Sequence, residues 1–106
     1  MDYSPKVLGK DMKFQSRLID TYFANFEDYL EECKSFMVDP VKLARAIHKL
    51  KSAIAYLANK EVVDQLSYWE NDFETNHTEA TELWFNELVT FVNEFNQHLK
   101  VYRSKI

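Results

Sequence analysis

Glycine is almost missing from this chain, and its scarcity constrains the fold more than any other feature of the sequence. Among 106 residues there is one glycine, Gly9, and there are two prolines, Pro5 and Pro40. Tight turns between strands rely on glycine, whereas helices run for long stretches without either residue. The sequence therefore predicts helices and argues against a β-sheet. It also excludes a Gly-rich phosphate loop of the P-loop or dinucleotide-binding type, so we do not expect a kinase.

Apolar residues recur at helical spacing in four segments, which predict helices at about residues 10–36, 40–58, 61–74 and 79–102. The inward-facing stripe of the first segment is expected to contain Phe14, Leu18, Tyr22, Phe26, Tyr29, Leu30, Cys33 and Met37.

Several residues predict where these helices begin and end. Asp39 can cap the second helix, and Pro40 is preset for its first turn. Asn59 is expected to end that helix, because asparagine tolerates a left-handed backbone. Asn76 or Thr78 is expected to cap the fourth helix.

The length and the short connections predict a single domain spanning residues 1–106. Apolar residues make up 46% of the chain, which is enough for one continuous core. Residues 1–9 are expected to be a poorly ordered or loosely packed lead-in, and the bundle to occupy about residues 10–102. Short connections between helices of this length force antiparallel neighbours. The predicted fold is all-α, an antiparallel up-down-up-down four-helix bundle.

The second segment carries one histidine at the edge of its apolar stripe, which consists of Leu43, Ile47, Leu50, Ile54 and Leu57. Ala44 and Ser52 flank His48 one turn away on either side, and Ala55 continues the same face. Lys51 lies on this face too. Small neighbours are expected to leave the imidazole uncovered, with an ammonium in reach of any group attached to it.

The charge of the chain is unevenly distributed. The net charge is −4, which argues against nucleic acid as a partner. Residues 41–58 nevertheless contain four basic residues and no acidic one: Lys42, Arg45, Lys49 and Lys51. These charges form either an ordinary solvated face or a surface that attracts a phosphoryl group or an acidic pocket.

The motif around this histidine resembles that of the histidine-containing phosphotransfer (HPt) domains of two-component phosphorelays. The family pattern is roughly His-x-Leu-Lys-Gly-Ser/Ala-x-x-x-Leu-Gly on the second helix of a four-helix bundle. The corresponding residues here are His48-Lys49-Leu50-Lys51-Ser52-Ala53 and Leu57-Ala58, with Trp69-Glu70 further along the chain. Ser52 and Ala58 stand where the family usually has glycine, and both are small.

The resemblance implies a function and a role for each matching residue. His48 would accept a phosphoryl group from the aspartate of a receiver domain and pass it to another receiver. Lys51 would stabilise the phosphoryl oxygens, and Glu70 would orient the histidine. A neutral imidazole nitrogen is a competent nucleophile near neutral pH, and phosphoryl transfer depends mainly on positioning and charge neutralisation.

The same resemblance implies the partners. Receiver domains of response regulators, and a hybrid sensor histidine kinase, would dock on the face formed by Ala44, Ser52 and Ala55. The family takes its Mg²⁺ from the receiver, and no metal-ligand cluster is visible in the sequence, so neither a metal site nor another cofactor is expected.

Other features of the sequence indicate the compartment. A single cysteine, Cys33, excludes an internal disulfide and fits a reducing environment. No run is apolar enough to span a membrane, and the amino terminus lacks the apolar core of a signal peptide. We therefore expect a cytoplasmic protein, and a monomer. His77 and His98 have no motif around them and are expected to be surface residues.

Two other functions remain open at this point. The chain could be a non-catalytic bundle that binds a receiver or a kinase without carrying phosphate, although a degenerate copy commonly loses the histidine. It could also be a structural or adaptor bundle unrelated to phosphorelays, which would have no exposed apolar rim around His48.

Overall fold

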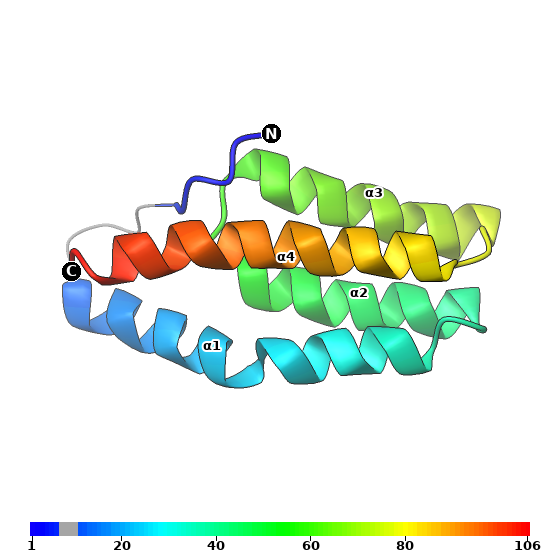
Figure 1. The fold of residues 1–106 in the computed structure, drawn as a ribbon, viewed down its shortest axis with the longest axis horizontal. Coiled ribbons are helices and arrows are strands. Elements are labelled where there is room, and N and C mark those ends of the chain that lie inside the picture. The colour runs from blue at the N-terminus through cyan, green and yellow to red at the C-terminus, as the bar shows by residue number, and fades with distance from the viewer. Residues whose placement is uncertain (7–10) are drawn as a thin grey trace.

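The computed structural model describes residues 1–6 and 11–106 and confirms the all-α four-helix bundle (Figure 1). The helices are α1 (Met12–Ser35), α2 (Pro40–Ala55), α3 (Lys60–Asn76) and α4 (Glu82–Arg103). Each runs antiparallel to the one before it, so the bundle is up-down-up-down. α2 packs between α1 and α3, and α4 closes the arrangement against α1. The start of α1 was predicted at Lys10, which lies outside the described residues.

A single apolar core fills the space between the four helices. It includes Ile19 and Cys33 of α1, Leu50 of α2, and Phe95 of α4, all with no exposed surface. The α3–α4 side is aromatic: the ring of Trp84 meets those of Trp69 and Phe73 edge-on, with centroids 6.1 and 4.7 Å away. Such arrangements favour aromatic pairs beyond the area that they bury.

The buried stripe of α1 differs in part from its prediction. Phe14 is 52% exposed, whereas Gln15 and Ile19 are buried. Gln15 can be buried because its polar atoms have partners: Tyr102 donates a hydrogen bond to its Oε1 at 2.7 Å, and its Nε2 donates to the carbonyl of Lys6. A polar residue with distant partners cannot be recognised as a core residue from apolar periodicity.

Each helix begins with a side-chain cap, and the cap of α2 is the residue predicted from the sequence. Asp11 and Asp39 accept hydrogen bonds from the amides of Phe14 and Lys42, and Pro40 occupies the first turn of α2. The predicted cap of α4 was wrong. Its cap is Thr81, which accepts from Trp84, rather than Asn76 or Thr78.

The left-handed residue also differs from the prediction. Asn59 does not end α2 with a left-handed backbone; its φ and ψ are −73° and 174°, and it caps α3. α2 ends earlier than predicted, at Ala55, and a short turn follows it. The left-handed position lies at the end of α3 instead, where His77 has a φ of 51°.

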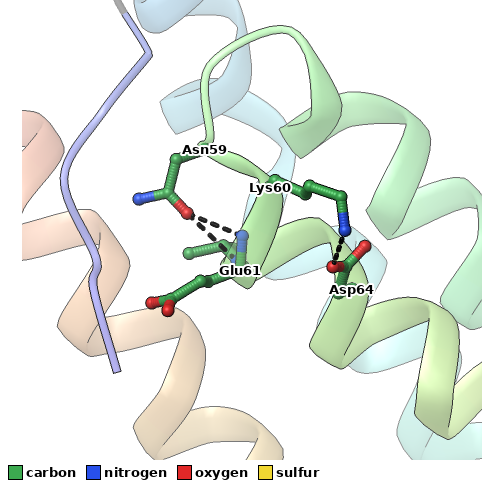
Figure 2. A network of polar contacts seen from close by, with 5 residues as sticks. Asn59, Lys60, Glu61 and Asp64 are labelled. Atoms are coloured by element: carbon green, nitrogen blue, oxygen red, sulfur yellow. Dashed lines mark hydrogen bonds and ion pairs between the residues drawn. The ribbon is translucent and has the colours of Figure 1, made fainter.

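Residues 1–6 pack against the corner between α2 and α3, contrary to the expected loose lead-in. The side-chain nitrogen Nδ2 of Asn59 donates hydrogen bonds at 2.9 Å to the backbone carbonyls of Asp2 and Ser4. The backbone amide of Lys6 donates to the carbonyl of Leu57. Figure 2 shows the carbonyl oxygen of Asn59 directed at the first turn of α3 and its amide nitrogen directed at the amino-terminal segment. One side chain therefore joins this segment to the start of a helix. Residues 7–9 of the predicted lead-in lie outside the described residues.

Candidate functional site

His48 lies in the middle of α2 on the face turned away from the core. The same helix buries Leu43, Ala44, Ala46, Ile47, Leu50 and Ile54. The His48 side chain is 60% exposed. The apolar stripe of α2 thus fixes the helix against its neighbours and leaves the imidazole open to solvent.

Glu70 of α3 reaches across to this histidine. α3 packs against α2, and the distance from Nδ1 of His48 to Oε1 of Glu70 is 3.1 Å. The carboxylate is partly covered, with the Glu70 side chain 18% exposed. The structure therefore brings together two residues that are 22 positions apart in the sequence.

Lys51 shares the same carboxylate oxygen. Its Nζ lies 3.0 Å from Oε1 of Glu70, and its side chain is 21% exposed. The ammonium is therefore committed to Glu70 and held beside the helix. It balances the charge of a carboxylate that would otherwise be partly buried without a counter-ion.

The contact with Glu70 determines which nitrogen of His48 can act as a nucleophile. A carboxylate only accepts hydrogen bonds, so Nδ1 must carry the proton and donate it to Oε1. In the neutral ring, the lone pair then lies on Nε2. Among residues 1–6 and 11–106, this nitrogen has no hydrogen-bond partner. In the neutral ring, the unprotonated nitrogen thus belongs to a side chain that is 60% exposed.

The three residues expected to form the docking face are not equally accessible. Ser52 is exposed and Ala55 is partly buried. Ala44 is only 3% exposed, so it is not the open flank that the helix spacing suggested. Val41, one turn before Arg45, supplies exposed apolar surface near the site.

A hollow of about 310 Å³ adjoins the imidazole between α2 and α3. It is lined by Val41, Ala44, Arg45, His48, Glu70 and Glu74. Arg45 and Glu74 were not among the predicted site residues. The available signal was their spacing, since Arg45 precedes His48 by three residues and Glu74 follows Glu70 by four, and such residues share a helix face.

The other two histidines lie elsewhere. His77 follows the last residue of α3, and His98 of α4 contacts the carbonyl of Glu94 through Nδ1 and lies beside the ring of Tyr3. Across the described ranges, no three histidine, cysteine or acidic side chains gather in a way that could hold a metal ion. In the same ranges, no helix combines the length and the apolar character needed to cross a membrane.

No family model, no curated protein and no solved structure matches this chain. Function is therefore inferred from the geometry of the site and from the resemblance of its motif.

Proposed function

We propose that this chain is a cytoplasmic histidine phosphotransfer protein of a two-component phosphorelay. His48 accepts a phosphoryl group from the aspartyl phosphate of a receiver domain and passes it to the aspartate of another. Receiver domains of response regulators, with a hybrid sensor kinase upstream, are the proposed partners. The observation that carries this proposal is the contact of Nδ1 with Glu70, which leaves Nε2 exposed as the nucleophile.

The proposed transfer step forms one bond to phosphorus, breaks another and involves no oxidation or reduction. The lone pair of Nε2 attacks phosphorus, the new N–P bond forms, and the P–O bond to the aspartate breaks, releasing a carboxylate. The proton on Nδ1 stays in place, so the ring becomes positively charged. Glu70 stabilises that charge through the existing hydrogen bond. In the reverse direction a receiver carboxylate attacks phosphorus, and neutral His48 leaves.

Lys51 supports this chemistry through Glu70. Its ammonium lies 3.0 Å from the carboxylate oxygen that also contacts the imidazole, so it fixes the position of Glu70. The motif implied that Lys51 contacts the phosphoryl oxygens directly, whereas the role proposed here is to position Glu70.

The proposal is tested by phosphorylating the chain in two ways. Phosphoramidate, a small donor, needs no docking surface, and a receiver domain charged with acetyl phosphate tests transfer from an aspartate. Both donors should produce an acid-labile, base-stable phosphate on one residue. His48→Gln should abolish the label with unchanged helical content, because surface substitutions rarely perturb a fold.

His98→Gln is the matched control, since it makes the same replacement at another exposed histidine. It should be labelled like the unaltered protein. Label that persisted in His48→Gln, or no acid-labile phosphate from either donor, would overturn the proposal.

A further inference from the structure

Within residues 1–6 and 11–106, Arg45 is the one lysine or arginine that lines the hollow beside His48. It precedes the histidine by three residues on α2, so the two side chains are neighbours on the helix surface. Glu70 and Glu74 of α3 line the opposite side. A phosphoryl group on Nε2 would add two negative charges next to these two carboxylates.

The cations around the hollow differ in whether they are already paired with a carboxylate. Lys51 lies 3.0 Å from Glu70, and Lys49 lies 2.8 Å from Glu32 of α1. Among residues 1–6 and 11–106, Arg45 has no carboxylate within ion-pairing distance. Its guanidinium is therefore available for an incoming anion, and the ammonium of Lys51 is not.

We propose that Arg45 binds the phosphoryl oxygens of phosphorylated His48 within this hollow, with Lys51 acting as a positioning residue for Glu70. This inference rests on the proposed function. A guanidinium presents paired N–H donors in a plane, which matches two phosphoryl oxygens better than a single ammonium does. Glu74 opposes the binding, because its carboxylate shares the hollow with the phosphoryl group.

The first experiment compares variants that remove one positive charge from the same helix. Phosphoramidate is the donor, so no partner surface takes part. Arg45→Gln should slow labelling of His48 by roughly tenfold or more, as expected when one hydrogen bond to a charged group is lost. Lys49→Gln is the matched control, because Lys49 is adjacent to His48 in sequence but pairs with Glu32. It should label within about twofold of the unaltered protein, since an exposed ion pair contributes little.

The second experiment measures the phosphoryl group directly. A ³¹P NMR titration of the phosphorylated chain follows the last ionisation of the phosphoryl group. Arg45→Gln should raise the pH of its midpoint, because a neighbouring cation favours the dianion. Glu74→Gln should lower that midpoint, and Arg45→Lys should restore it in part.

The outcomes separate this inference from the proposed function. If His48 is labelled but Arg45→Gln behaves like the unaltered protein, Arg45 does not bind the phosphoryl group. If Lys49→Gln has the same effect as Arg45→Gln, diffuse charge explains the result and the inference is wrong. An effect seen only with a charged receiver places Arg45 against the partner, which also overturns it. Failure of the unaltered chain to accept phosphate from either donor contradicts the proposed function itself.

Discussion

At the scale of single residues, one carboxylate oxygen organises the site. Oε1 of Glu70 contacts both Nδ1 of His48 and Nζ of Lys51. The histidine and lysine come from one helix and the glutamate from another, so the site depends on the packing of α2 against α3. The nitrogen of His48 that keeps the lone pair is selected by a residue that is itself partly covered.

Removing that carboxylate should change the tautomer of His48 before it changes the fold. In Glu70→Ala, the neutral ring should shift toward the Nε2–H form, because no acceptor holds the proton on Nδ1. Labelling by phosphoramidate should slow by roughly ten- to a hundredfold, the loss expected for a hydrogen bond to a charged group. Nitrogen chemical shifts of the ring, measured above its titration range, report the tautomer. An unchanged tautomer ratio would mean that Glu70 does not orient the imidazole.

The predicted positions of the site residues agree with the structure or differ from it according to what determines each position. His48 and Lys51 follow from a motif within one helix, and periodicity placed both on the same face. The accessibility of Ala44 depends on which side of α2 a neighbour covers, and Arg45 and Glu74 share a hollow only because two helices pack. Contacts of this kind require the arrangement of the bundle, which one helix's own sequence does not contain.

At the scale of elements, the start of α3 is joined to the amino-terminal segment by one residue. The carbonyl oxygen of Asn59 accepts from the amides of Glu61 and Val62, while its amide nitrogen donates to the carbonyls of Asp2 and Ser4 (Figure 2). The amide of Asp2 in turn donates to the carboxylate of Glu61. Local rules identified Asn59 as a boundary residue but assigned it to the wrong helix, since asparagine serves both helix starts and helix ends.

Asn59→Ala should therefore have two effects, whereas the loss of a residue that only caps a helix should have one. The free energy of unfolding should fall by about 1–2 kcal/mol through loss of the cap. The amide of Lys6, which donates to the carbonyl of Leu57, should also exchange faster with solvent. Urea unfolding and hydrogen exchange measure the two effects.

Thr81→Ala is the matched control, because Thr81 caps α4 and none of the hydrogen bonds among residues 1–6 and 11–106 joins it to residues 1–6. It should lower stability by a similar amount and leave exchange at Lys6 unchanged. Asn59→Ser, which keeps a capping oxygen, should mainly accelerate exchange. Equal protection of Lys6 in Asn59→Ala and the unaltered chain would show that the segment is held by other contacts.

At the scale of the whole molecule, polar contacts hold the first helix against the last. Tyr22 of α1 donates a buried hydrogen bond at 2.6 Å to Oδ1 of Asn96 of α4, and burial raises the pKa of this tyrosine. Arg103 forms an ion pair with Asp20 and lowers the pKa of that carboxyl group. The fold class and helix order followed from glycine scarcity and apolar periodicity. These cross-bundle pairs did not, because their members are more than 70 residues apart in sequence.

The buried thiol of Cys33 allows the opening of this bundle to be timed. Its thiol has no exposed surface, and burial raises its pKa to about 12, so the reactive thiolate hardly forms in the folded chain. A thiol-specific reagent should then modify it only when the bundle opens, at a rate set by opening and reclosing. The free energy of opening obtained from that rate should agree with the value from urea unfolding. Full modification within seconds in native buffer would show that α1 separates from its neighbours without global unfolding. This single thiol thus measures how long the four helices stay together.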